Sequence, residues 1–86
     1  NEKTFEDLEK EIKEVDVGGR LVLDNNYTFT NNSKVNGIGI TKPITIEGNG
    51  MTLDGKHSGR IFYVDKNATN VVFKISFCLL TTSLTQ

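Results

Sequence analysis

The chain has 86 residues, of which 36% are hydrophobic and 24% are charged, and its formal net charge is -1 at pH 7. This length corresponds to one domain or a piece of one, because domains typically contain on the order of 100 residues or more. The interspersed acids and bases provide no basic surface for nucleic acid, so we expect no nucleic-acid partner. No apolar run is long enough to span a bilayer, so we expect no membrane insertion by this segment.

The cysteine content and the first residues bear on the cellular location. A single cysteine, Cys78, excludes an internal disulfide framework, and we interpret it as a small apolar residue in a hydrophobic stretch. The chain begins Asn1-Glu2-Lys3, without an initiator Met or an apolar leader. This start suggests a mature product or a piece of a longer protein.

The first segment has the pattern of an amphipathic helix. Thr4 followed three residues later by Asp7 is a capping-box pattern, and Gly18-Gly19 is expected to end the helix. Four apolar residues recur on one helical face: Phe5, Leu8, Ile12 and Val15. We expect this face to cover an apolar end of the structure that follows.

From Leu21 onward, short apolar segments alternate with polar corners. The unit is a strand, an acid, an Asn or Gly corner and another strand, and it returns after roughly twenty residues, within the period range of solenoid coils. Three asparagines are candidates for stacked corners, although they fit isolated turns as well: Asn25, Asn49 and Asn67. Gly48-Asn49-Gly50 suits a corner that needs a positive φ. Because each unit is too small to bury its apolar face alone, we expect Leu23, Ile46 and Val64, or their immediate neighbours, to stack in register.

Residues 39–55, which read Gly-Ile-Thr-Lys-Pro-Ile-Thr-Ile-Glu-Gly-Asn-Gly-Met-Thr-Leu-Asp-Gly, carry a family resemblance. This stretch resembles the first coils of the adhesin-like surface proteins of methanogenic archaea. Those proteins, like related bacterial polymorphic surface proteins, share the pectate-lyase-like right-handed parallel β-helix. The helical segment at 4–8 and the strand at 21–24 are also similar to that family. The likeness covers about the first three quarters of the chain, and the sequence departs from the family pattern at residues 71–77, which lack the expected Asn corner.

The repeat and the resemblance together predict a mainly β fold. We expect an N-terminal amphipathic capping helix at residues 1–19, followed at 20–77 by the opening coils of a right-handed parallel β-helix, a solenoid. The remaining residues, 78–86, form an atypical tail that fits a truncated or disordered end.

Several residues are candidates for chemical roles. Four acids recur at the corners, where a pair in adjacent coils could share a hard cation, although acids beside Gly and Asn are also ordinary turn residues: Asp24, Glu47, Asp54 and Asp65. His57, between Lys56 and Ser58, could be a general base oriented by Asp54, or a solvated loop residue. Arg60 could bind a sugar carboxylate or face water. We predict no catalytic, cofactor or metal site.

Polar sequence also marks candidate modification and ligand sites. Three asparagines match the N-glycosylation pattern and favour an exported chain: Asn26, Asn31 and Asn67. Tyr27 or Tyr63 could stack against carbohydrate, although two tyrosines make a poor aromatic platform.

The function expected from these features is a non-catalytic structural or adhesive segment of an exported, extracellular or cell-surface β-helix protein, with a carbohydrate or cell-surface ligand. An open last coil would expose unpaired strand edges, so we expect self-association at that end. The alternative is an N-terminal fragment of a polysaccharide-active lyase or hydrolase with the same fold. A third interpretation is a small independent helix-plus-sheet domain with an intracellular binding role.

Overall fold

The computed structural model describes residues 2–33, 36–56 and 61–74. They contain one helix, α1 (Phe5–Lys13), and short strands of two or three residues. The strands are β1 (Glu2–Thr4), β2 (Arg20–Val22), β3 (Asn26–Thr28), β4 (Ile38–Ile40), β5 (Thr45–Glu47), β6 (Leu53–Asp54), β7 (Phe62–Val64) and β8 (Val72–Lys74). The chain is therefore a small mixed α/β domain.

Helix α1 begins at the residues that the sequence indicates. Thr4 is the N-cap: its hydroxyl accepts the Asp7 N–H at 3.3 Å, and Asp7 accepts the Thr4 N–H at 3.0 Å. Phe5, Leu8 and Ile12 are buried, so the predicted apolar face is confirmed. The helix ends earlier than expected, at Lys13, whose carbonyl accepts a hydrogen bond from Lys42 Nζ at 3.1 Å.

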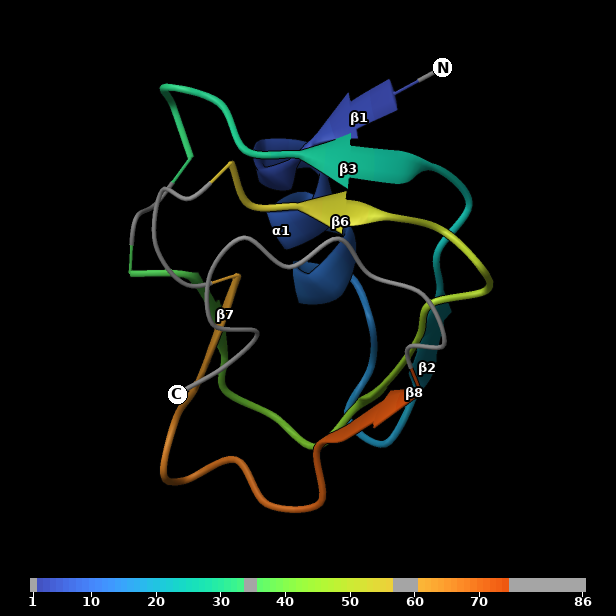
Figure 1. The fold of residues 1–86 in the computed structure, drawn as a ribbon. Coiled ribbons are helices and arrows are strands. Elements are labelled where there is room, and N and C mark those ends of the chain that lie inside the picture. Colours follow the sequence, from blue (N-terminus) through green and yellow to red (C-terminus); the bar gives the residue numbers. More distant parts are fainter. Residues whose placement is uncertain (1, 34–35, 57–60, 75–86) are drawn as a thin grey trace.

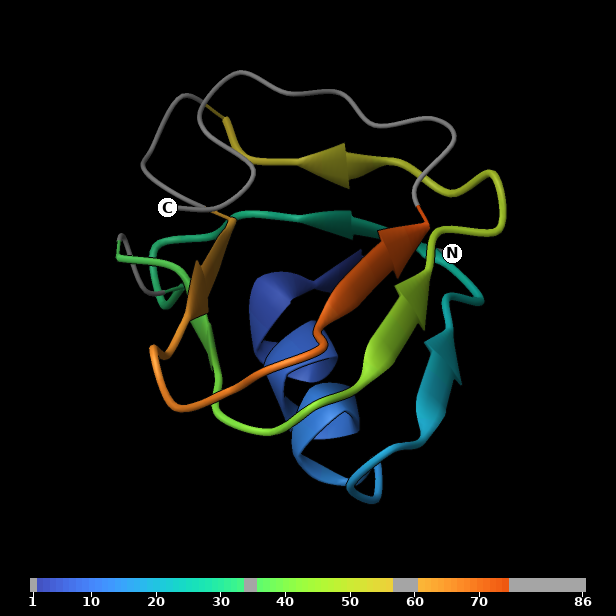
Figure 2. The same cartoon turned by 90° about the horizontal axis from the view of Figure 1, so that it is seen from below.

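In the described residues, all strand pairs are parallel and are divided among three small sheets (Figure 1). The sheet orders are β1-β3-β6, β2-β5-β8 and β4-β7. Viewed from below, the three sheets lie on different sides of one interior, with α1 behind β5 and β8 (Figure 2). Parallel pairing requires a long crossover between partners, which is why consecutive strands lie in different sheets.

One apolar cluster unites the helix and the three sheets. The buried side chains that form it are Phe5, Leu8, Ile12, Leu23, Tyr27, Ile38, Ile40, Ile44, Ile46, Leu53, Ile61 and Phe62. Because helix residues share this cluster with residues from each sheet, the helix is an integral part of the core.

The expected fold class, a capping helix followed by the first coils of a right-handed parallel β-helix, is wrong. The described residues form three separate small sheets of very short strands, and no solenoid is evident among them. The helix also does not precede the strands: β1 comes before α1 and pairs with β3. The repeat in the sequence therefore reflects short parallel strands around a shared core.

The expected stack of Leu23, Ile46 and Val64 is also corrected. Ile46 lies opposite Leu21 in β2 and Phe73 in β8. Val64 belongs to another sheet, where it lies opposite Ile40. Residues 78–86, expected to form an atypical tail, lie outside the described residues.

Candidate functional site

Two of the four acids considered as cation ligands are engaged within the chain. Glu47 Oε2 lies 2.9 Å from Arg20 Nη1 on the outer face of the β2-β5-β8 sheet. Asp65 follows β7 and accepts the Asn67 N–H at 2.8 Å, an ordinary turn arrangement. These two carboxylates stabilise a sheet face and a turn, and they do not face each other.

Asp54 likewise has local partners. Its Oδ1 accepts the Lys56 N–H at 3.0 Å, and its Oδ2 lies 3.9 Å from Lys56 Nζ. Its opposite residue in β3 is Thr28, so no second acid lies beside it in the register. Among the described residues, no group of three or more His, Cys, Asp or Glu side chains could hold a metal ion.

Asp24, the fourth acid, belongs to a set of side chains that we call the Lys3 cluster: Lys3, Glu11, Asp24 and Tyr27. Lys3 Nζ lies 2.8 Å from Glu11 Oε2 and 3.3 Å from Asp24 Oδ1. The buried Tyr27 hydroxyl donates to Glu11 Oε1 at 2.7 Å and contacts Asp24 Oδ1 at 3.3 Å. The cluster joins β1, α1, β3 and the turn before β3.

The contacts within the Lys3 cluster stabilise the charge states it has at neutral pH. The hydrogen bond to Glu11 raises the pKa of Lys3, and the hydrogen bond from Lys3 lowers the pKa of Asp24. Burial, together with the hydrogen bond to Glu11, raises the pKa of Tyr27. Since efficient acid–base catalysis needs a pKa near the working pH, these shifts favour a structural role.

Sequence reasoning missed the Lys3 cluster, although Tyr27 carried a signal for it. Tyr27 occupies an inward position of an alternating strand, and a buried tyrosine usually finds a partner for its hydroxyl. Glu11, next to the buried Ile12 on the helix, was the available acceptor. Lys3 gave no such signal, because nothing in Glu2–Thr4 marks a strand.

The three candidate glycosylation sites differ in their surroundings. Asn31 and Asn67 are exposed in turns. Asn26 lies in β3, where its Oδ1 accepts the Thr52 N–H at 2.8 Å. A sugar on Asn26 would disturb a contact between β3 and the segment before β6, whereas the side chains of Asn31 and Asn67 take part in no hydrogen bond between strands of the described chain.

The corner asparagines also separate into different roles. Asn49 has a φ of 53° and donates from Nδ2 to the Leu23 carbonyl at 3.1 Å, and Gly50 has a φ of 76°. The positive φ predicted for this corner is therefore confirmed. Asn70, which was not singled out, has a φ of 60°. The sequence therefore indicated the left-handed corner at Asn49 but not the one at Asn70.

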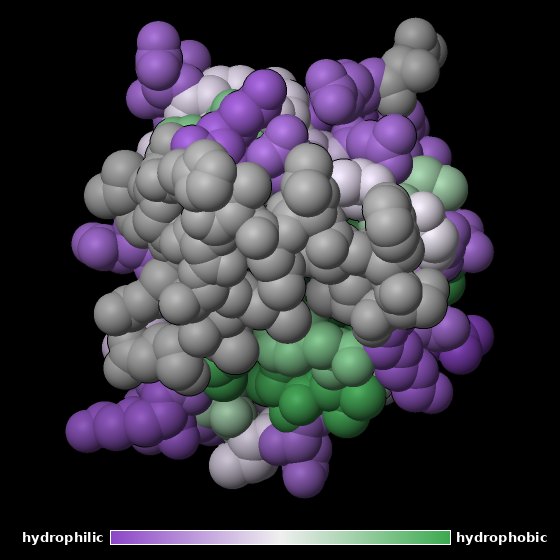
Figure 3. Space-filling model, viewed as in Figure 1, coloured by the Kyte–Doolittle hydropathy of each residue, from purple (hydrophilic) through white to green (hydrophobic). Residues whose placement is uncertain are grey.

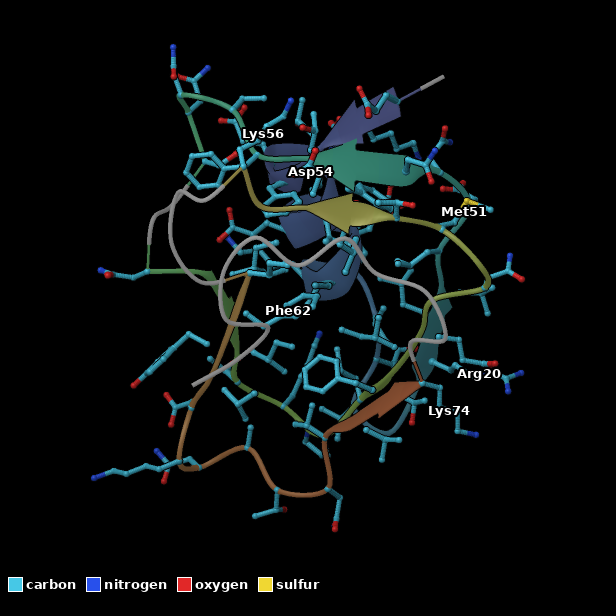
Figure 4. The ribbon with its side chains drawn as sticks, viewed as in Figure 1. Arg20, Met51, Asp54, Lys56, Phe62 and Lys74 are labelled. Atoms are coloured by element: carbon cyan, nitrogen blue, oxygen red, sulfur yellow. The ribbon has the colours of Figure 1, made fainter. Side chains whose placement is uncertain are left out.

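The outer face of the β2-β5-β8 sheet combines charges with exposed valines. Arg20 and Lys74 both point outward from this sheet (Figure 4), and Glu47 lies between β2 and β8 in the strand order. Val22 and Val72 are 46% and 40% exposed, on the two outer strands. An exposed valine on each outer strand of this sheet, Val22 opposite Glu47 and Val72 opposite Thr45, allows a mutational comparison.

Strand β8 has one edge that pairs with β5 and one that does not. The Val72 N–H donates to the Ile44 carbonyl at 3.0 Å, and the Lys74 carbonyl accepts from the Gly48 N–H at 2.8 Å. Because backbone groups alternate in direction along a strand, the N–H and C=O of Phe73 face away from β5. Within the described part of the chain, no strand pairs with this second edge.

Strand β7 has the same arrangement. The Ile38 N–H donates to the Ile61 carbonyl and the Asp65 N–H to the Ile40 carbonyl, both at 2.9 Å. The backbone groups of Phe62 therefore face away from β4. In the described residues the sheet contains β4 and β7 only, so the outer edge of β7 has no partner strand there.

Apolar side chains lie behind these two edges. The rings of Phe62 and Phe73 pack with centroids 5.0 Å apart, and Phe62 points into the interior (Figure 4). Apolar surface shows over β8 on the face seen in Figure 3. Tyr63 and Val72 are 39% and 40% exposed beside the edges. The outer edges of β7 and β8, which no strand of the described residues pairs, form together with these four side chains what we call the β7–β8 surface.

The remaining candidates can be placed briefly. Tyr27 is fully buried and cannot stack on carbohydrate, whereas Tyr63 reaches the surface. His57, Ser58, Arg60 and Cys78 lie outside the described residues. Helix α1, the helix of the described chain, is too short and too polar to cross a bilayer.

Comparisons with protein-family models, with curated proteins and with solved structures found no match to this chain.

Proposed function

We propose that this chain is a non-catalytic structural or adhesive segment of an exported or cell-surface protein, and that it binds a second copy of itself through the β7–β8 surface. The observation that carries the proposal is the presence of two parallel strands, β7 and β8, whose outer edges have no described partner strand. An unpaired edge is a template for a further strand.

The β7–β8 surface offers both components of such an interaction. The outward N–H and C=O groups of Phe62 and Phe73 provide backbone hydrogen bonds to an added strand. Tyr63 and Val72 add partly exposed apolar area beside these groups. Backbone pairing supplies general affinity in this mode of recognition, and side chains supply specificity.

A binding role accounts better than catalysis for the polar residues of the described chain. Glu47, Asp54 and Asp65 are each held by a neighbouring base or backbone N–H. A polysaccharide-active site would need carboxylates gathered at one place. Glu11 and Asp24 do lie together, but both carboxylates are engaged by Lys3 and by the Tyr27 hydroxyl.

Export is part of the proposal and has two supports. Residues 39–55 resemble adhesin-like surface proteins, and Asn31 and Asn67 are exposed acceptors for glycans. Antibody labelling of intact source cells should detect the segment at the surface. Labelling that requires permeabilised cells would contradict the location.

Sedimentation equilibrium of the 86-residue chain tests the self-association. Reductant is included because Cys78 could otherwise cross-link two copies. We expect mass to rise with concentration and Val72→Lys to weaken association about tenfold or more, equivalent to about 1.4 kcal/mol. Val22→Lys, which changes a similarly exposed valine on β2, serves as the control and should associate like the unmodified chain. A monomer at every concentration would show that the proposal is wrong.

A further inference from the structure

The chain contains the dipeptide Asn-Gly twice, at Asn36-Gly37 and at Asn49-Gly50. Because glycine has no Cβ to crowd its N–H, the main-chain nitrogen of the glycine can reach the side-chain carbonyl carbon of the asparagine before it. Whether the two atoms meet depends on the freedom of the asparagine amide and of the backbone between them. The two sites share a sequence and differ in their surroundings, so each serves as a reference for the other.

The Asn49-Gly50 dipeptide is held in a tight turn. The Met51 N–H donates to the Gly48 carbonyl at 2.9 Å. The two residues between them have φ values of 53° and 76°, as in a type I′ turn. Asn49 Nδ2 also donates to the Leu23 carbonyl at 3.1 Å, which fixes the side-chain amide. The Gly50 nitrogen therefore reaches the amide carbon only when these hydrogen bonds open.

Asn36 lacks these restraints. It is exposed in the turn before β4, and no described residue holds its side-chain amide by a hydrogen bond. The Gly37 N–H likewise makes no hydrogen bond to the described backbone. Gly37 has a φ of +98°, and an added Cβ would lie 2.9 Å from the Phe62 carbonyl carbon. Packing therefore requires glycine at the position that makes Asn36 reactive.

We propose that Asn36 is a site of spontaneous deamidation in the folded chain and that the turn protects Asn49. The Gly37 nitrogen attacks the side-chain carbonyl carbon of Asn36 and gives up its proton. Ammonia leaves with the former amide nitrogen, and a cyclic imide forms. Water then opens this ring at either carbonyl and yields aspartate or isoaspartate. The reaction consumes water and releases ammonia, without any change of oxidation state.

The two products affect the chain differently. Each carries a carboxylate in place of the amide, so the formal net charge becomes more negative than -1. Aspartate leaves the main chain unchanged at an exposed position. Isoaspartate adds a methylene to the main chain directly before Gly37, whose backbone packs against that of Phe62. We therefore expect the isoaspartate form to unfold at a lower temperature than the aspartate form.

Incubation of the whole chain in mildly alkaline buffer tests the proposal. Mass spectrometry with peptide fragmentation follows the conversion of amide to acid at Asn36 and Asn49 over time. In the folded chain, Asn36 should react about tenfold faster or more than Asn49, because two ordinary hydrogen bonds must open at the second site. In concentrated urea the two dipeptides lose their different surroundings and should react at similar rates.

Asn36→Gln is the matched control. Its longer side chain would have to close a larger, less favourable ring, so this variant should lose the fast reaction and keep a cooperative thermal transition. Equal rates at the two sites of the folded chain, or a faster reaction at Asn49, would overturn the proposal. A rate at Asn36 that falls about tenfold between urea and the folded chain would also overturn it, since folding would then protect this site as well.

Discussion

The edge of the molecule that carries β1 and the edge that carries β7 and β8 consist of similar short parallel strands with unlike surroundings. At the first edge, α1 packs behind the sheet and the Lys3 cluster fills the inward side of β1 with charge. At the second, the rings of Phe62 and Phe73 lie behind the strands. The central residue of the outer strand therefore differs between the two edges, a lysine in β1 and a phenylalanine in β8.

The largest expected loss of stability follows from truncating a core residue on the helix side. Leu8 is fully buried in the apolar cluster, so Leu8→Ala should lower the free energy of unfolding by about 2–5 kcal/mol. Urea denaturation measures the change. Val17, which is 71% exposed, provides the control, and Val17→Ala should change stability by no more than about 0.5 kcal/mol. Equal effects would show that α1 is not part of the core.

Beside β7, the backbone of Gly37 packs closely against the backbone of Phe62 and Tyr63. Its φ is +98°, and an added Cβ would lie 2.9 Å from the Phe62 carbonyl carbon, so Gly37→Ala should cost about 2 kcal/mol or more. Gly50→Ala, with a φ of +76° and open space, should cost only about 1–2 kcal/mol of backbone strain. Thermal unfolding of both variants decides the order. A milder effect at Gly37 would contradict the close packing beside β7.

The start of α1 provides a smaller perturbation. Thr4→Ala removes the hydroxyl that accepts the Asp7 N–H, and should cost about 1 kcal/mol. Because Thr4 is also the last residue of β1, the change should loosen the helix side without altering the β7–β8 surface. Thr69→Ala, at an exposed position, is the control. Urea midpoints that do not differ between the two variants would count against the cap.

The smallest expected effect is a pH dependence from Tyr27. The pKa of Tyr27 is raised in the folded chain. The protonated hydroxyl therefore stabilises the fold fully at pH values below about 10, the pKa of tyrosine in the unfolded chain. This stabilisation is lost as the pH rises from there toward the pKa of the folded chain. At pH 10 the unfolded tyrosine is half ionised, which lowers the unfolding free energy by about 0.4 kcal/mol.

Urea midpoints between neutral pH and pH 10 measure this change. Tyr27→Phe should remove the tyrosine part of the alkaline loss. Tyr63→Phe, which changes a tyrosine at the surface, should retain it. Identical profiles for the two variants would contradict the buried hydroxyl contact to Glu11.

The helix could be predicted from the sequence because its signals are local. A cap at Thr4 and Asp7 depends on residues three positions apart, and the buried face of Phe5, Leu8 and Ile12 follows helical spacing. The positive φ at Asn49 was predictable for the same reason.

The sheets could not be predicted, because their partners are distant in sequence. Alternation identified apolar segments but not which of them would pair, and so Leu23 was expected where Leu21 lies opposite Ile46. A slip of this kind changes which side chains share a face. The Lys3 cluster was missed because it depends on β1, a polar segment without strand signals, reaching residues from α1 and β3.

The exclusively parallel pairing of these strands has a kinetic consequence. Each pairing joins residues more than twenty positions apart, as between Arg20 and Thr45, so no hairpin can form early and guide the rest. Chains dominated by such distant contacts fold slowly for their size. Helix α1 is the element that can form first from local interactions, and the strands would then gather around its apolar face.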